Sequence, residues 1–411
     1  MSYQELRKLY YNDPKVYKET YEARLGSEDT VLLDFFIGEK QAFFVQNTDV
    51  LKLSLQIERI DKEVRRLSAS LPGIAKKQYS RKCLIDEIVL TNKIEGVHSS
   101  RKEIGDVLET LEERSDKAGK KKRFQGLVNK YLKLMVHEPL VLRSCEDIRA
   151  IYDELFLKEV ISEDPTHEPD GKIFRKELSE VYNAADKVIH RGLMPESRII
   201  EVMEQALLFL KDESVDLLYR LCLFHYMIEY IHPFYDGNGR LGRFIVSYYL
   251  TETLDPLLAY RISETIKENI KAYYDAFMIC NDPRNLGDLT PFLLMMLRMI
   301  LSAIGELKES LSRRLTRWNR YEQLVLSFDD VKKNGKLLQL YSVLVQASLF
   351  SERGISTTEL QETLSMSYNT IKKLLGQIDE KNLLRTSMPV KIKYYEIDLD
   401  RLDDMLLSEM M

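Results

Sequence analysis

Apolar residues recur every three or four positions along most of the chain, the spacing that places them on one face of a helix. The clearest run precedes residue 232 and consists of Leu217, Leu218, Leu221, Phe224, Ile228 and Ile231. Pro233 ends this helix, because proline has no amide hydrogen to donate. Other helices are predicted around residues 51–63, 85–95, 99–160, 244–250, 289–304, 308–320, 337–349 and 368–381. The chain is therefore predicted to be mainly α.

Segments with the pattern of strands are short and few. Two β-like runs, Val31–Ile37 and Ala42–Val45, lie near the N-terminus. A third segment, Lys187–Pro195, contains the β-branched pair Val188 and Ile189, with Gly192 and Pro195 after it. This segment predicts a small hairpin or an extended edge, and an ordinary loop packed on the helices is the alternative.

The order and length of the predicted elements change after Lys332-Lys-Asn-Gly335. A helix over 337–349 is followed by a second helical run, a Ser-Met-Ser turn and a third helix over 368–381. Alternating residues then extend from 383 to 397, with a wing around Ser387-Met-Pro-Val-Lys. This order of elements resembles a winged helix.

Composition narrows the class of protein. Sixty Lys and Arg against 65 Asp and Glu give a net charge of −5 and a pI of about 5.9. The chain as a whole therefore lacks the net positive charge that is typical of proteins that bind nucleic acid or an anionic membrane. The four cysteines are scattered along the chain. No two of them have the spacing typical of a zinc site, and they are too few for a dense disulfide framework. The N-terminus is too polar for a secretory signal, and the apolar stretch 289–304 is shorter than the ~20 residues of a membrane span. We therefore expect a cytoplasmic protein without a membrane partner.

One stretch, His232-Pro-Phe-Tyr-Asp-Gly-Asn-Gly-Arg-Leu-Gly-Arg243, concentrates groups that bind phosphate. Gly237 and Gly239 lack Cβ, so the backbone N–H groups around Asn238 can converge on an anion. The helix that follows adds the positive end of its dipole. The stretch is interpreted as a phosphate-binding loop.

Side chains of the same stretch supply further chemistry. Arg240 and Arg243 lie three positions apart on a helix, so both guanidiniums can bind neighbouring phosphate oxygens. Asp236 offers an oxygen ligand suited to Mg²⁺. His232 has an unperturbed pKa that suits a general base near neutral pH. The alternative is a glycine-rich turn between helices, with a structural histidine and two solvated arginines.

The stretch resembles the signature of the Fic family, His-Pro-Phe-x-Asp/Glu-Gly-Asn-Gly-Arg-x-x-Arg, and matches every fixed position. The resemblance implies transfer of AMP from ATP to a Ser, Thr or Tyr hydroxyl of a target protein, which can include the chain itself. His232 would deprotonate the hydroxyl, the loop would bind the nucleotide phosphates, and Asp236 would position Mg²⁺.

A hexapeptide upstream, Thr91-Asn-Lys-Ile-Glu-Gly96, matches the Ser/Thr-x-x-x-Glu-Gly/Asn pattern of the inhibitory helix in autoinhibited Fic proteins. Thr91 and Glu95 are four positions apart and share one helix face, and Gly96 lets the chain turn directly afterwards. The resemblance implies that Glu95 pairs with Arg243 and occupies the space that a γ-phosphate needs. A plain helix end is the alternative.

The resemblance also implies an adenine pocket and a flap. Tyr273, Tyr274, Phe277 and Asn281 occupy the family's adenine-pocket positions, although the link that follows Asn281 looks longer than usual. Without the family, a Tyr-Tyr pair on an amphipathic helix is typical of a core or its rim. The position of the segment with Val188 and Ile189 resembles that of the Fic flap, which holds a target peptide by strand addition.

A winged helix usually indicates DNA, which here would meet Asn369, Lys372 and Lys373 on the recognition helix. Its charge argues against DNA, because residues 336–411 carry nine basic and eleven acidic side chains. We therefore prefer a role in docking a protein or in forming a homodimer.

The resulting hypothesis is a mainly α protein with a Fic-type helical core, a short hairpin flap and a C-terminal winged helix. Its predicted parts are an N-terminal regulatory segment with the inhibitory helix (1–115), a catalytic core (116–308), a helical linker (309–335) and a winged helix-turn-helix domain (336–411). The activity expected is protein adenylylation held in check by Glu95. Alternatives are removal of AMP with Glu95 orienting water, another nucleotidyl or phosphoryl transfer, and a DNA-binding regulator. Gly239 argues against phosphotransfer, since the phosphotransferase relatives carry Lys there.

Overall fold

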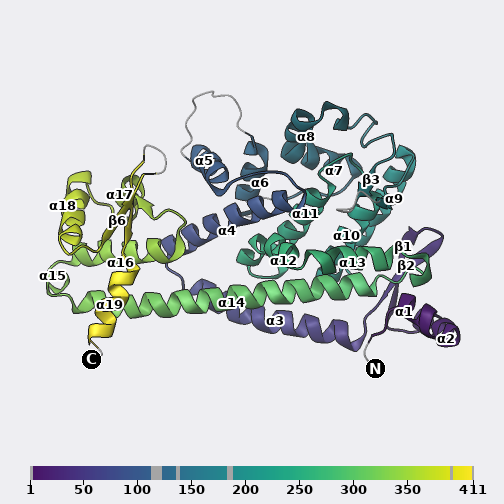
Figure 1. Ribbon diagram of the computed structural model, residues 1–411, viewed down its shortest axis with the longest axis horizontal. Helices are drawn as coiled ribbons and strands as arrows, with labels where there is room; N and C mark the ends of the chain where they lie inside the picture. Colours follow the sequence, from purple (N-terminus) through teal and green to yellow (C-terminus); the bar gives the residue numbers. More distant parts are fainter. Residues whose placement is uncertain (1–2, 113–122, 136–138, 183–187, 389–391, 410–411) are drawn as a thin grey trace. The chain divides into compact units, whose positions relative to one another are not determined.

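The computed structural model describes residues 3–112, 123–135, 139–182, 188–388 and 392–409 and is dominated by helices (Figure 1). The prediction of a mainly α fold is confirmed. The chain forms two compact units, one made of residues 1–61 and 85–305, the other of 62–84 and 306–411. The boundaries of these two units differ from those of the four parts predicted from the sequence. The functions assigned to those four parts remain predictions.

The first unit begins with two helices and a hairpin. These are α1 (Leu6–Asn12), α2 (Pro14–Leu25), β1 (Thr30–Ile37) and β2 (Lys40–Val45), and both predicted β-like runs are strands. Asp13 starts α2 by accepting hydrogen bonds from the backbone N–H groups of Lys15 and Val16. Apolar side chains from α1, α2 and β2 form a small separate core.

The rest of the first unit is built almost entirely of helices. Two helices, α3 (Thr48–Ala69) and α4 (Gly73–Ile94), contribute residues to both units. The following elements are α5 (Arg101–Glu112), α6 (Gln125–Met135), α7 (Cys145–Tyr152), a π-helical turn (Asp153–Leu157), α8 (Lys158–Glu163), β3 (Glu180–Tyr182), β4 (Val188–Arg191), α9 (Glu196–Leu210), α10 (Leu217–Ile231), α11 (Asn238–Thr253), α12 (Ile262–Glu268) and α13 (Ile270–Cys280). Short 3-10 turns occupy Pro165–His167, Pro256–Tyr260 and Pro283–Asn285.

Helix α10 is the centre of this unit, because it packs against both α9 and α11 and most of its side chains are buried. The predicted helix ending at Ile231 is therefore confirmed. Strands β3 and β4 pair antiparallel beside its C-terminal end, with Val181 opposite His190. Residues 183–187 and the side chain of Ile189 lie outside the described part, so the flap role of this hairpin remains a prediction.

The N-terminal hairpin holds the link that follows α13. Phe43 N donates to Gly287 O at 3.0 Å, and Leu289 N donates to Phe43 O at 2.7 Å. Arg24 reaches the buried carboxylate of Asp288 at 2.7 Å. The link that looked long in the sequence is thus fixed by main-chain pairing and a buried ion pair with the N-terminal segment.

The second unit combines residues 62–84 with the C-terminal part of the chain. Its elements are the end of α14 (Thr290–Ser327), α15 (Asp329–Lys332), α16 (Gly335–Phe350), β5 (Ile355–Ser356), α17 (Thr357–Leu364), α18 (Tyr368–Asp379), β6 (Leu384–Ser387), β7 (Tyr394–Ile397) and α19 (Leu399–Glu409). The three strands form an antiparallel sheet in the order β5-β7-β6. Arg81 pairs with Glu359 at 3.1 Å within this unit. The assignment as a winged helix remains a prediction.

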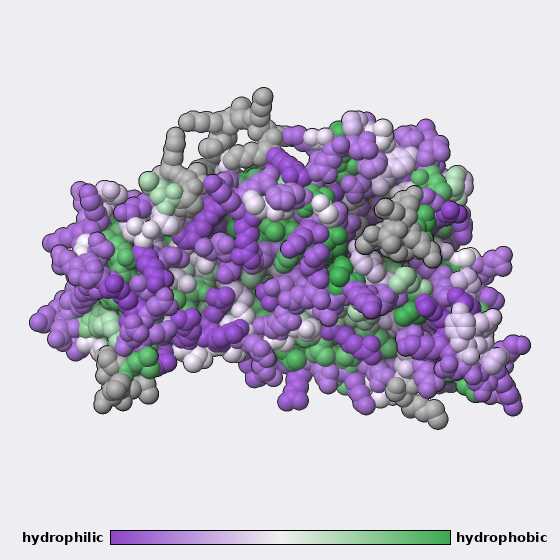
Figure 2. All heavy atoms as spheres, viewed as in Figure 1, coloured by the Kyte–Doolittle hydropathy of each residue, from purple (hydrophilic) through white to green (hydrophobic). Residues whose placement is uncertain are grey.

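Helix α14 joins two segments that the sequence suggested as separate helices, 289–304 and 308–320. Among the described residues it is the one helix long and apolar enough by composition to cross a membrane, yet 72% of its most apolar window is buried inside the protein. That degree of burial is typical of a core helix. The face of the molecule in Figure 2 is mostly hydrophilic, with small separated hydrophobic patches.

Candidate active site

The predicted phosphate loop joins the end of α10 to the start of α11. His232 follows α10 in the left-handed region, with φ 52° and ψ 62°, and its N–H donates to Ile228 O. Gly237 also has a positive φ, 81°, directly before α11 begins at Asn238. A side chain at Gly237 would be strained at that φ, so glycine permits the turn.

The side chain of Asn238 is used inside the loop. It accepts a hydrogen bond from Phe234 N at 3.0 Å and donates one to Phe234 O at 2.8 Å. Asn238 is buried, and the two bonds hold the loop in a closed turn. Its proposed contact with phosphate would therefore come from its backbone at the first turn of α11.

Arg175 clamps the backbone of the candidate base. Its Nε donates to His232 O at 2.8 Å and its Nη2 to Leu193 O at 2.8 Å, and the side chain is fully buried. A Cβ at Gly192 would lie 2.3 Å from Arg175 Nη2. Glycine at that position allows the guanidinium to approach the chain that carries His232.

His232 is a neutral imidazole in this setting. Burial, with smaller contributions from His190 and Arg175, lowers the pKa of His232 to about 3. Its ring lies 6.4 Å from the ring of His190 on β4. A neutral ring at physiological pH can accept a proton, which is the state that a general base requires.

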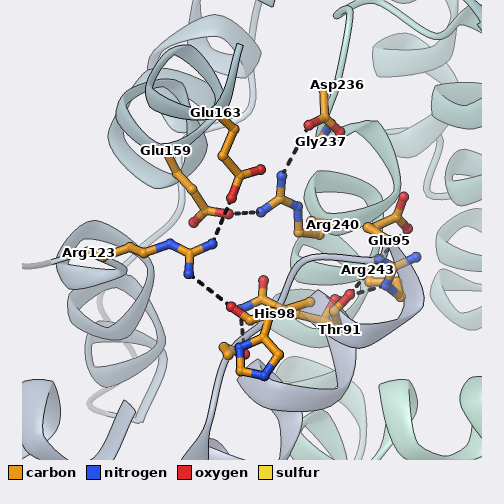
Figure 3. Close-up of polar contacts among 12 residues, drawn as sticks. Thr91, Glu95, His98, Arg123, Glu159, Glu163, Asp236, Gly237, Arg240 and Arg243 are labelled. Carbon is orange, nitrogen blue, oxygen red and sulfur yellow. Dashed lines mark hydrogen bonds and ion pairs between the residues drawn. The ribbon is translucent and has the colours of Figure 1, made fainter. Parts of the chain in front are cut away.

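Arg240 and Arg243 are both buried, and each is paired with a carboxylate (Figure 3). Arg240 Nη1 lies 2.6 Å from Glu159 Oε1 on α8, and Arg240 Nη2 lies 3.7 Å from Asp236 Oδ2. Asp236 Oδ1 also accepts from Gly237 N at 2.5 Å. Arg240 is thus held on the α8 side of the loop in this structure.

Arg243 binds the two residues predicted to form the inhibitory contact. Its Nη2 lies 2.6 Å from Glu95 Oε1, and its Nε donates to Thr91 Oγ1 at 2.9 Å (Figure 3). Burial opposes the charge on Arg243, but Glu95, followed by Tyr273 and Glu229, raises the pKa of the guanidinium above its usual value. The predicted pairing between Glu95 and Arg243 is therefore present.

The end of α4 aims Glu95 at the loop. Gly96 has φ +76°, Gly96 N donates to Lys93 O, and Val97 N donates to Asn92 O at 2.9 Å. These bonds form the glycine-terminated helix end of the Schellman type. A Cβ at Gly239 would lie 2.3 Å from Glu95 Oε1, so the second glycine of the loop leaves the space that Glu95 occupies.

A cavity of about 240 Å³ lies over the loop. Its lining includes most of the predicted site residues, namely Glu95, His232, Asp236, Gly237, Asn238, Gly239, Tyr273, Tyr274, Phe277 and Asn281. Neither arginine of the motif is part of the lining, since both guanidiniums are covered by their partners. A larger groove of about 720 Å³ between α1, α13 and α14 contains none of the predicted residues.

The predicted adenine wall lies on one side of this cavity. The rings of Tyr273 and Phe277 are 5.1 Å apart and nearly perpendicular. Asn281 Oδ1 accepts from Tyr226 OH at 2.6 Å, and Asn281 Nδ2 lies 3.4 Å from His190 Nδ1. The four predicted residues are therefore brought together despite the unusual link after Asn281.

Several residues that the sequence did not single out also line the cavity. They are Glu180, Val181, His190, Glu229, Tyr230, Tyr235 and Met278. Glu229 carried a signal that could have been used, because it precedes His232 by three positions, in the last turn of the helix predicted to end at Ile231. Glu159 carried no such signal, since it lies 81 residues from its partner Arg240.

The donor set near the loop suits a lightly coordinated cation. Among the described residues, no group of three or more His, Cys, Asp or Glu side chains is close enough to hold a metal ion by itself. Mg²⁺ is commonly held by one or two carboxylates together with substrate phosphates. Asp236 fits that mode, since its carboxylate lines the cavity and is about one third exposed, at 32%.

Residues 143–250 match the Fic/DOC family, so the chain carries a Fic/DOC domain. Over 97 residues it is 32% identical to protein adenylyltransferase fic-1 of Caenorhabditis elegans, a match that covers 23% of this chain and 17% of that protein. The fold is similar to a Fic family protein from Desulfovibrio desulfuricans G20, with a TM-score of 0.51, 21% identity, and 86% and 96% of the two chains covered. A solved structure of C. elegans Fic-1 gives a TM-score of 0.42 at 19% identity, covering 64% and 74%.

Proposed function

We propose that the protein is a protein adenylyltransferase, which moves AMP from ATP to a hydroxyl side chain of a target protein and releases pyrophosphate. The observation that carries the proposal is that His232, Asp236 and the aromatic wall of Tyr273 and Phe277 border one cavity. The Fic/DOC domain and the local similarity to an adenylyltransferase support it.

In this proposal the target hydroxyl gives its proton to His232 as its oxygen bonds to the α-phosphorus. The bond between that phosphorus and the pyrophosphate oxygen then breaks. The N–H groups at the start of α11 bind the phosphates, and Tyr273 and Phe277 border the base. Mg²⁺ held by Asp236 would neutralise phosphate charge.

Glu95 is proposed to inhibit this reaction in the resting protein. Its carboxylate bonds the guanidinium that we assign to the outer phosphates and lines the same cavity. Arg243 is 1% exposed and Glu95 25%, so a competing phosphate must displace a largely buried ion pair. Glu95 therefore opposes nucleotide binding through both charge and space.

The test is to incubate the purified chain with Mg²⁺ and ATP labelled at the α-phosphate, alone and in lysate. Labelled proteins are then mapped by mass spectrometry. We expect an added AMP group on a Ser, Thr or Tyr side chain and no labelling after Mg²⁺ is chelated. The same incubation with ATP labelled at the γ-phosphate is the matched control, which should label nothing.

Other outcomes distinguish the rival functions. Transfer of the γ-label would indicate a phosphotransferase. Release of AMP from an adenylylated target, lost in a Glu95→Gln variant, would indicate de-adenylylation, a reaction that the place of Glu95 in the cavity makes chemically reasonable. The absence of any chemistry, with the Glu95→Gly variant also silent, would contradict the proposed enzyme.

A further inference from the structure

Glu229 is a half-buried carboxyl group for which the proposed reaction has no role. It lies on α10 one turn before His232 and lines the same cavity. Its Oε1 is buried, has no hydrogen-bond partner within the described structure, and would lie 3.4 Å from a Cβ built on Gly242 of α11. A buried polar atom without a hydrogen-bond partner costs free energy. We therefore interpret Glu229 Oε1 as an atom whose hydrogen-bond partner is supplied by a bound ligand.

The charges around Glu229 decide its protonation. Burial comes first and, with Glu95 beside it, raises the pKa of Glu229 to about 8, although Arg243 of α11 opposes the shift. From α13, Tyr273 and Tyr274 face the same region with raised pKa values, so both are neutral at physiological pH. On α10 itself, burial lowers the pKa of His225 to about 3, so it is neutral as well. Glu229 therefore holds a proton and is a hydrogen-bond donor at neutral pH.

The position of this donor indicates which part of a nucleotide it would meet. Arg243 is the cation that lowers the pKa of Glu229, and its guanidinium is paired with the carboxylate of Glu95 in this structure. A phosphate that replaces Glu95 at Arg243 would bring acceptor oxygens to the same place. An ionised Glu229 would repel that phosphate, whereas a protonated Glu229 can donate to it.

We propose that Glu229 in its protonated form donates a hydrogen bond to the phosphate chain of the bound nucleotide, which makes nucleotide binding depend on one proton at this carboxyl. The proposal rests on the proposed function, because it requires a nucleotide in the cavity. It assigns Glu229 to ligand binding, and it predicts proton uptake whenever the free carboxyl is ionised.

The direction of the effect follows from linkage. Phosphate charge raises the pKa of the carboxyl further, so the complex binds more protons than the free protein above the free pKa. ATP affinity should then fall up to tenfold for each pH unit above that value. Removing Glu95 lowers the free pKa, because Glu95 is one of the groups that raise it, so the fall begins at a lower pH in a Glu95→Gly chain.

The experiment is calorimetric titration of ATP into the full-length Glu95→Gly variant at pH 8, in buffers that differ in ionisation enthalpy. The comparison variant carries Glu229→Gln as well, which keeps the shape and a donor but cannot titrate. We expect uptake approaching one proton per ATP in the first protein and clearly less in the second. Titration of ATP itself is common to both and cancels in the comparison.

Two further measurements complete the test. Between pH 7 and 9, ATP affinity should fall in the Glu95→Gly protein and stay nearly constant once Glu229→Gln is added, with thermal unfolding as the check on folding. Adenosine, which has no phosphate, should show no difference between the variants. Equal proton uptake by both proteins, or a difference that persists with adenosine, would overturn the assignment. Failure of both to bind ATP would instead contradict the proposed function.

Discussion

His232 combines a left-handed backbone position with a ring that lines the cavity, and Arg175 holds its carbonyl oxygen. No second histidine lies in the loop, so no other group of the loop can replace His232 as the base. We expect His232→Ala to reduce AMP transfer by about 10²–10⁴-fold, the usual contribution of a positioned general base. Nucleotide binding should persist, since the loop backbone is unchanged. Transfer assays and ATP titration check both statements, and full labelling by a folded variant would remove His232 from the mechanism.

The same ring makes a prediction about pH. Because burial is the main cause that lowers the pKa of His232 to about 3, the imidazole stays neutral and able to accept a proton down to about that pH. The initial rate of transfer in a Glu95→Gly protein should therefore show no inflection near 6.5, the ordinary histidine value. Rates measured from pH 7.5 to 5 test this. A loss of activity with a midpoint near 6.5 would show that the ring becomes solvated before the reaction.

Arg243 is predicted to discriminate between nucleotides. We assign it to the outer phosphates, so Arg243→Ala should weaken ATP binding while changing AMP binding much less. The substitution also leaves Glu95 without its partner, so the measurement belongs in a Glu95→Gly background. Calorimetry with ATP and AMP gives the two ratios. Equal losses for both nucleotides would place Arg243 beside the α-phosphate or in a purely structural role.

At the scale of the element, α4 delivers Glu95 through its glycine-terminated end, and Thr91 gives Arg243 a second bond. Losing one partner of a largely buried pair is worth a few kcal/mol, and each ~1.4 kcal/mol is tenfold. Glu95→Gly should therefore raise self-labelling tenfold or more. Glu95→Gln separates charge from obstruction, because it keeps the shape. If neither substitution raises labelling or ATP affinity, the inhibitory assignment fails and 91–96 is a plain helix end.

The elements differ in how far the sequence predicted them. Helix α10 and the turn at Gly96 follow from local signals, an apolar period and a glycine, so both could be read directly. The two arginines were expected to face a ligand together, yet each is bound by a carboxylate. The pairing of Glu95 with Arg243 could be predicted from the family pattern. The pairing of Glu159 with Arg240 could not be predicted, because it depends on tertiary packing between segments far apart in the sequence.

At the scale of the whole chain, the charge of the second unit indicates which kind of partner it suits. In residues 336–411, nine basic and eleven acidic side chains leave little charge for phosphate. Arg385 is already paired with Asp398 and Asp400 in the region of the predicted wing. These pairs reduce what the module could offer to a DNA backbone. We therefore expect the protein to dock a protein partner or a second copy through this unit.

Salt dependence gives the sharpest test of that expectation. A module that binds DNA through several phosphate contacts loses affinity steeply as salt rises, because each contact releases counterions. We expect the full-length chain to show only weak binding to duplex DNA at 50 mM salt. The double substitution of Lys372 and Lys373 to Ala on α18 should leave that weak binding nearly unchanged. Tight binding that falls with salt and is lost in the double variant would assign α18 to DNA recognition, and sedimentation of the same samples would show whether the chain instead self-associates.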